Sequence, residues 1–315
     1  MATIGEEITL RQTWLWSGQI AHDHWQNVAH RRLTQVFEAA DVAPFDDTSR
    51  FVFFSDLHRG DNGPTDAFAR NEALFLRVLN HYYRQGFAYV EVGDGDELWQ
   101  NRKFSAVRQA HGRVFDLLHQ FDQRNRLHLV AGNHDIQGNW HRPVVKDGLV
   151  AQEGLILQHA GTGQRLFVVH GHQADFASDR LHVMSRLAVR YIWRRLQLLS
   201  FGSASSRASD FRRQWGCFGQ CVVDWLQTKL RQIEQRIVIW AQDQHQTIIC
   251  GHTHRQAFAP HGAPSYFNTG CGVTPGVLTG IEIRDGHIQP VRWSVGEGYQ
   301  RLATARKLNR IDAWQ

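Results

Sequence analysis

Five short polar clusters in this 315-residue sequence combine Asp, His and Asn with neighbouring glycines. Carboxylate, imidazole and amide oxygen are the donors that hold Mn²⁺, Fe or Zn²⁺ in proteins. On an extended segment, residues two apart point the same way, so both side chains of an Asp-x-His or a His-x-His can face one cation. The spacing therefore predicts a metal site. In chain order the clusters are Asp56-Leu57-His58, Gly93-Asp94, Gly132-Asn133-His134-Asp135, His170-Gly171-His172 and Gly251-His252-Thr253-His254.

Each cluster follows an apolar segment that is predicted to be a strand. The first three strands are expected over residues 51–55, 87–92 and 126–131, with helices over about 66–85 and 103–122 between them. This alternation is typical of a parallel sheet, whose strand ends meet at one edge where ligands bind. Glycines beside the polar residues allow tight turns and close approach of the backbone to a ligand.

The remaining elements are read from the same patterns. A helix is expected over about 21–40, followed by a loop that contains Pro44. Residues 173–245 show no strand signal, and helices are expected over about 178–200 and 210–244. A short helix is expected to end the chain. Further strands are expected over 155–159, 165–170, 247–250, 265–268, 277–284 and 287–293, the last two joined by an Asp285-Gly286 turn.

The clusters resemble the signature of the calcineurin-like metallophosphoesterases, which runs DxH, GD, GNH[DE], H and GHxH, and every element matches in order across 56–254. The resemblance implies an α/β fold, a four-layer α-β-β-α sandwich of two mixed sheets. It also implies two divalent ions, with Mn²⁺ expected and Fe, Zn²⁺ and Mg²⁺ as alternatives. His172 is an alternative ligand to His170, which we favour because it comes first after its strand. The implied ligands are Asp56, His58, Asp94 and His254 for one ion and Asp94, Asn133, His170 and His252 for the other.

A phosphoesterase reaction follows from such a site. Two cations about 3.5–4 Å apart can hold a bridging hydroxide in line with a phosphorus atom and neutralise the phosphate oxygens. His134 is then the expected proton donor to the leaving alkoxide. Its ring needs a fixed partner, which is either Glu97, at a position where the family commonly has Asp, or Asp135. Arg59 is expected to contact substrate phosphate, with a surface ion pair as the alternative.

The segment between the fourth and fifth clusters is basic. Residues 180–236 contain eleven Arg or Lys residues and three acidic residues. We therefore predict an N-terminal helical extension (1–50), a metallophosphoesterase core (51–172 and 246–315) and a helical lid inserted in the core (173–245). Within the lid, Arg190, Arg194 and Arg195 lie beside Tyr191, Ile192 and Trp193 and are expected to contact substrate or an anionic lipid surface.

The lid suggests a second resemblance, to the UDP-2,3-diacylglucosamine pyrophosphatases of lipid A synthesis. They carry a helical lid at this point and share a GD-x-x-E-x-W arrangement, matched here by Gly93, Asp94, Glu97 and Trp99. Their third motif has Arg where this chain has His134. Because cleavage of a pyrophosphate needs less protonation of the leaving group, His134 favours a phosphomonoester or phosphodiester substrate.

Three alternatives to this phosphoesterase remain. The second enzymatic hypothesis is a nucleotide-sugar or lipid-linked pyrophosphatase. The chain could also be a non-catalytic scaffold with the same fold, which binds partners and is not an enzyme. A nuclease is the least supported, because only the basic lid favours nucleic acid. The N-terminus lacks a secretory pattern, and no apolar run reaches the roughly 18 residues of a membrane span. We expect a cytoplasmic protein whose lid makes any peripheral membrane contact.

Overall fold

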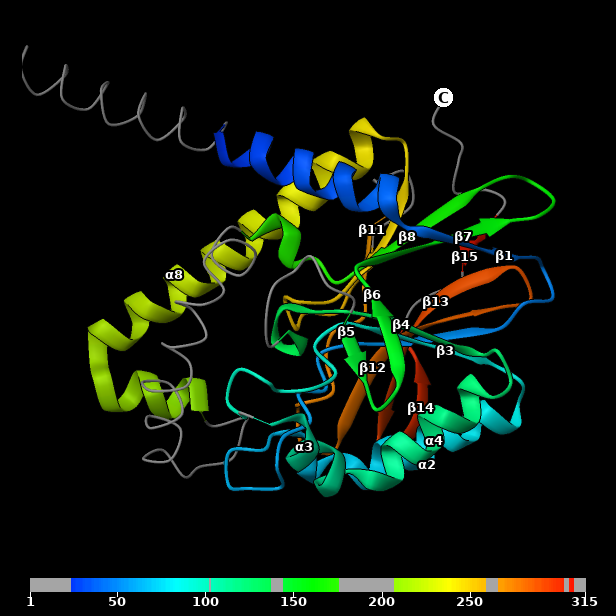
Figure 1. Ribbon diagram of the computed structural model, residues 1–315. Helices are drawn as coiled ribbons and strands as arrows, with labels where there is room; N and C mark the ends of the chain where they lie inside the picture. Colours follow the sequence, from blue (N-terminus) through cyan, green and yellow to red (C-terminus); the bar gives the residue numbers. More distant parts are fainter. Residues whose placement is uncertain are drawn as a thin grey trace, which may run out of the picture.

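The computed structural model describes residues 24–101, 103–136, 144–175, 207–258, 266–302 and 306–308. Within these residues the chain forms two mixed β-sheets, as predicted (Figure 1). Sheet B has the strand order β14-β13-β12-β2-β3-β4-β6-β5, with β15 paired to β13. Its strands are β2 (Phe51–Phe54), β3 (Ala88–Val92), β4 (Leu127–Val130), β5 (Val144–Lys146), β6 (Leu149–Gln152), β12 (Val277–Arg284), β13 (His287–Ser294), β14 (Gly298–Arg301) and β15 (Arg306–Lys307).

Sheet A has the strand order β1-β7-β8-β9-β11-β10. The expected hairpin is present, because β7 and β8 pair antiparallel. Strands β8, β9 and β11 run parallel and bring the segments after residues 169 and 250 to one edge. The strands are β1 (Asp41–Phe45), β7 (Gly154–His159), β8 (Arg165–Val169), β9 (Thr247–Cys250), β10 (Ala257–Phe258) and β11 (Tyr266–Asn268).

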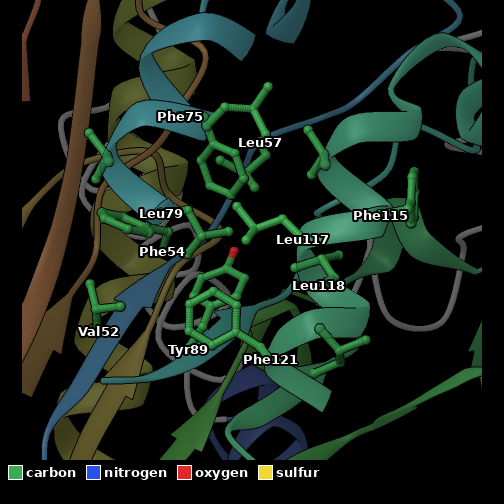
Figure 2. Close-up of a cluster of buried hydrophobic side chains, with 14 of the residues drawn as sticks. Val52, Phe54, Leu57, Phe75, Leu79, Tyr89, Phe115, Leu117, Leu118 and Phe121 are labelled. Atoms are coloured by element: carbon green, nitrogen blue, oxygen red, sulfur yellow. The ribbon is translucent and has the colours of Figure 1, made fainter. Parts of the chain in front are cut away.

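Three hydrophobic clusters separate four layers. The first lies between sheet B and helices α2 (Glu72–Arg84), α3 (Phe104–Ala110) and α4 (Gly112–Asp122), and contains Phe54, Phe75 and Phe121 (Figure 2). The second lies between the two sheets. The third lies between sheet A, the helix over residues 24–39 and the end of α8 (Arg207–Asp243). The predicted α-β-β-α order of layers is therefore confirmed.

Strand β2 shows how the sequence specifies this sandwich. Val52 and Phe54 belong to the cluster facing the helices, whereas Phe51 and Phe53 belong to the cluster facing sheet A. Successive side chains of a strand point to opposite faces, so a strand covered on both faces must be apolar throughout. The unbroken FVFF run meets that requirement.

Several local predictions were wrong. The expected loop around Pro44 is strand β1, which pairs parallel with β7 at the edge of sheet A, where a residue without a backbone N–H is tolerated. The helix expected over 103–122 is interrupted at His111. Strands over residues 298–301 and 306–307 were not predicted, and the short helix expected to end the chain is untested because the last seven residues lie outside the described part of the chain. The hairpin of β5 and β6 was not predicted.

The helices also bear on the predicted lid. Helix α8 matches the helix expected over 210–244, whereas the one expected over 178–200 lies outside the described residues. Towards its C-terminal end, α8 lies beside the helix over 24–39 (Figure 1). There Trp240 is fully buried and packs against Phe37 and Phe167. Among the described helices, none combines the length and apolar character that crossing a bilayer requires.

The interruption at His111 is a buried ionic junction. The imidazole is fully buried, with Nε2 2.8 Å from Asp66 Oδ2 and Nδ1 2.8 Å from Glu72 Oε2. Burial alone would lower the pKa of His111, but hydrogen bonds and charge from Asp66 and Glu72 raise it above its usual value of 6.5. His111 therefore ties the segment before α2 to the start of α4, and the two carboxylates favour its protonated form.

We expect His111→Gln to lower the free energy of unfolding by about 2–3 kcal/mol at pH 6, because two charge-assisted hydrogen bonds are lost. Since the pKa is higher in the folded state, the stabilisation is complete below the unfolded value and disappears as the pH rises through the folded value. Urea unfolding from pH 5.5 to 10 should therefore show the difference between wild type and variant shrinking with pH. The exposed His24→Gln serves as control. A difference that grows with pH would contradict the ion pair.

Candidate metal centre

The five polar clusters meet at the edge where the strands of both sheets end. Five of their residues have left-handed backbone conformations, with φ between 50° and 68°. Non-glycine residues rarely adopt this conformation, which costs of order 1–3 kcal/mol each and is concentrated at functional sites. The backbone at this edge is therefore bent at the residues whose side chains carry the chemistry. The five are Asp56, His58, Asp94, His252 and His254.

Backbone hydrogen bonds join these turns. The amides of Asp56 and His58 donate to the carbonyls of Gly93 and Asp94 at 3.0 and 2.9 Å. Gly251 N donates to His170 O at 3.0 Å, which links two turns of sheet A. Glycine is required at Gly132 because an added Cβ would collide with the carboxylate and amide of Asp94. Hydrogen bonds thus connect the turns that carry the clusters.

The first candidate ligand group contains Asp56, His58 and His254, whose donor atoms all lie within 4.8 Å of one another. His254 Nε2 is 3.1 Å from Asp56 Oδ1 and 3.2 Å from His58 Nε2. Asp56 is fully buried, whereas His254 is partly exposed. A cation here could bind two imidazoles and a carboxylate and still be reached from solvent.

The second candidate ligand group contains Asp94, His170 and His252 within the same 4.8 Å limit. His170 Nε2 is 3.1 Å from Asp94 Oδ2, and its Nδ1 lies 2.8 Å from Val92 O, which fixes the ring. Asn133, which precedes His134 in the chain, is buried. Its Oδ1 has no hydrogen-bond partner among the described residues. A buried amide oxygen without a partner suits a metal ligand.

Asp94 faces both groups. Its Oδ2 lies 3.1 Å from His170 Nε2 and 3.9 Å from His58 Nε2. Its Oδ1 accepts a 2.7 Å hydrogen bond from the amide of His134. The donors present, two carboxylates, four imidazoles and one amide oxygen, fit two borderline divalent ions that share Asp94.

Carboxylates and imidazoles in the two groups shift each other's pKa values. Burial disfavours the charged form of Asp56, but His254 and His170 outweigh it and lower its pKa to about 2. Burial likewise disfavours protonated His170, but Asp94 and Asp56 raise its pKa to about 9. A proton and a divalent cation therefore compete for the same rings, so cation binding releases protons.

Beside the first group, Glu97 binds two imidazoles at once. Its Oε1 lies 2.8 Å from His134 Nδ1, and its Oε2 lies 3.1 Å from His58 Nδ1. Trp99 stacks on the His134 ring with a centroid distance of 4.1 Å and an interplanar angle of 23°. Burial lowers the pKa of His134, but the charges of Glu97 and Asp94 raise it above its usual value. The ring is thereby fixed in position and favoured in its acid form.

Of the two partners considered for His134, the geometry favours Glu97. Asp135 points away from the ring, with Oδ1 accepting from the amide of Asp96 at 2.9 Å and Oδ2 from the amide of Gly132 at 2.8 Å. Asp135 therefore stabilises the turn that carries His134 and does not contact the imidazole.

Arg59 does not lie where a substrate could reach it. The side chain is fully buried, with Nε 2.7 Å from Asp96 Oδ1 and the terminal nitrogens 2.7 and 2.8 Å from the oxygens of Glu91. Arg59 therefore does not make the expected contact with phosphate. It forms an ion pair, as the alternative predicted, but the pair is buried and does not lie at the surface. In sequence, Arg59 directly follows the candidate ligand His58, and nothing marks Glu91, inside an apolar strand, as its partner.

His170 is better placed than His172 to bind a cation. His172 is buried and belongs to none of the donor groups found among the described residues. Its ring centroid lies 5.5 Å from that of His170. Burial, together with the neighbouring His170, lowers the pKa of His172 well below its usual value. The His172 ring thus lies beside the candidate ligands without joining either group.

Helix α8 touches the rim of the site. Glu234 accepts a 3.0 Å hydrogen bond from Thr253, and Arg236 donates to Ala174 O at 3.0 Å. Asp175, which the sequence analysis did not single out, lies 3.5 Å from His252 Nε2. The three lid arginines predicted to contact substrate, Arg190, Arg194 and Arg195, lie outside the described residues.

Comparison with known proteins gives distant structural neighbours. No family model matches the sequence, and no curated protein matches it. A single mutant of Vps29 from Entamoeba histolytica is 15% identical, with 82% of this chain and 99% of that chain covered and a TM-score of 0.36. Vps29 from Cryptosporidium parvum is 11% identical, with 82% and 98% covered and a TM-score of 0.37.

A protein assigned as a 5′-nucleotidase from Staphylococcus aureus, in complex with alpha-ketoglutarate, is 14% identical, with 82% of this chain and 53% of that chain covered and a TM-score of 0.34. Neighbours this distant say nothing about activity. The function must be inferred from the residues of the site itself.

Proposed function

We propose that this chain is a metal-dependent phosphoesterase of the calcineurin-like type. The observation that carries the proposal is the position of Asp94, which faces two His-containing donor groups while its Oδ1 anchors the amide of His134. Side chains that could hold metal and a fixed imidazole thereby occupy one edge of the fold. That combination suits hydrolysis of a phosphate ester.

Asp56, His58, Asp94 and His254 would hold one divalent ion, and Asp94, Asn133, His170 and His252 the other. Such ions, of which Mn²⁺ is our first choice, activate a water molecule as nucleophile and neutralise charge on the phosphate oxygens. The remaining requirement is a proton for the leaving alkoxide. His134 supplies it from Nε2, because Nδ1 is occupied by Glu97.

One feature of the chain supports an ester over a pyrophosphate as substrate, the presence of His134. Cleavage of a pyrophosphate expels a phosphate group, which is weakly basic and needs little protonation, whereas an alkoxide is strongly basic. Glu97 and Trp99 fix the His134 ring from its edge and its face, so that its proton can be delivered accurately to an alkoxide.

The test is turnover by purified protein loaded with Mn²⁺ on p-nitrophenyl phosphate, its bis-ester, a UDP-sugar and single-stranded DNA. We expect hydrolysis of one or both p-nitrophenyl esters, lost on chelation and restored by Mn²⁺. Turnover of the UDP-sugar alone would identify a pyrophosphatase, and turnover of DNA alone a nuclease. Two bound metal equivalents without any turnover would indicate a scaffold and would overturn the proposal.

A further inference from the structure

Beneath the candidate metal centre lies a lysine that belongs to none of the five clusters. Lys146 ends β5, and its side chain is only 3% exposed. Its Nζ lies 2.5 Å from Asp135 Oδ1, 2.9 Å from Asp96 Oδ2 and 3.7 Å from Glu91 Oε1. A buried lysine survives as a cation only with such partners.

The carboxylates that Lys146 binds hold the turns of the site together. Asp135 accepts from the amides of Asp96 and Gly132, so it joins the turn after β3 to the turn after β4. Asp96 also forms an ion pair with Arg59, which lies directly after the cluster that follows β2. Lys146 thus contacts the charges that connect three of the five clusters.

The balance of charge makes Lys146 necessary for this arrangement. The buried group contains three carboxylates, Glu91, Asp96 and Asp135, and two cations, Arg59 and Lys146. Arg59 is oriented towards Glu91 and Asp96, which leaves Lys146 as the cation in contact with Asp135 among the described residues. Without Lys146, Asp135 would be a buried carboxylate held only by backbone amides.

We propose that Lys146 is a positioning residue for the proton donor His134. Lys146 keeps Asp135 bound to both turns, and this fixes the short helix η2 (Asn133–Asp135) against the segment that carries Glu97. The His134 ring then meets Glu97 at 2.8 Å, and the His134 carbonyl accepts from the amide of Leu98 at 3.0 Å. This role rests on the proposed phosphoesterase function. Lys146, on the hairpin of β5 and β6, would then support the proton donor from outside the five clusters.

The kinetic test is Lys146→Met, which removes the charge and keeps the length. We expect both metals to stay bound and KM to change little. Turnover of an ester with a poor leaving group, phenyl phosphate, should fall about 10- to 100-fold, because a displacement near 1 Å has an effect of that size. Turnover of p-nitrophenyl phosphate should fall far less. Lys146→Arg should recover part of the loss, and the exposed Lys307→Met should have no effect.

A second readout does not depend on turnover. The Nδ1–H proton of His134, assigned by its absence in His134→Gln, should shift or broaden in ¹H–¹⁵N spectra of Lys146→Met. The ring signals of His111, whose ion pairs are with Asp66 and Glu72, should stay unchanged and serve as an internal reference. If Lys146→Met does not fold, Lys146→Met/Asp135→Asn restores the net charge of the cluster and takes its place.

An unchanged His134 signal, or a loss of turnover equal for both leaving groups, would overturn the positioning role. Wild-type protein that binds metals but hydrolyses no ester would instead refute the proposed function. In that event the spectra alone would decide whether Lys146 fixes the His134 ring.

Discussion

Asp94→Asn is expected to prevent binding of both divalent ions and to lower kcat/KM at least about 1,000-fold, equivalent to roughly 4 kcal/mol of transition-state stabilisation. The physical reason is that Asp94 Oδ2 faces both donor groups, so one neutralised carboxylate weakens two sites at once. Asparagine retains the acceptor for the amide of His134, which limits damage to the turn. Metal content after dialysis and steady-state kinetics on the active p-nitrophenyl ester are the measurements.

The matched control is Asp116→Asn, at an exposed aspartate on α4. It should bind two metal equivalents and turn over substrate as the wild type does. If Asp94→Asn keeps one metal at full affinity, Asp94 does not bridge. If it keeps both metals and its activity, the proposed centre is wrong.

His134→Gln is expected to leave metal content unchanged and to lower turnover about 10²- to 10⁴-fold on substrates with poor leaving groups. Its effect on p-nitrophenyl phosphate should be much smaller, because p-nitrophenolate departs without a proton. The reason is geometric, since Glu97 holds Nδ1 and leaves Nε2 to face the substrate. The measurement is kcat across a series of aryl and alkyl phosphates with increasing leaving-group pKa.

The outcome that contradicts this role is a loss of turnover independent of leaving-group pKa. That result would mean that His134 binds the phosphate or the metals and does not donate a proton. His119→Gln, on the outer face of α4, removes a histidine away from the centre and should give a flat, wild-type series. Loss of metal from His134→Gln would likewise exclude a role confined to proton transfer.

Much of this site can be predicted from the sequence because its signals are local. Polar residues directly after apolar strands, as at Asp56 and Asp94, are placed at a sheet edge by topology alone. The unbroken apolar FVFF run predicts a strand that is covered on both faces. Two mixed sheets in four layers followed from the resemblance, while the βαβ pattern by itself accounts only for the parallel part of sheet B.

The parts that could not be predicted depend on short elements without a periodic signal or on pairs that are distant in the chain. Lys146, which meets Asp135 of η2, lies on a hairpin whose strands are three and four residues long, too short for a periodic signal. Arg59 was expected to face substrate because it follows His58, and only the folded protein shows Glu91 and Asp96 beside it. Strand β1 was missed because proline argues against a strand unless its edge position is known.

The five left-handed residues of the centre have a consequence for the energetics of the whole chain. At roughly 1–3 kcal/mol each, they offset a sizeable share of the 5–15 kcal/mol by which a domain is stable. Cations that bind only the folded state would stabilise it against unfolding, by about 2.7 kcal/mol per site at a free concentration 100 times Kd. Protein purified in chelator should therefore melt at a lower temperature than protein in Mn²⁺. If these residues hold no metal, placing glycine at the five positions would raise the stability of the chain, so the strain is the free energy that the fold would give up for metal binding.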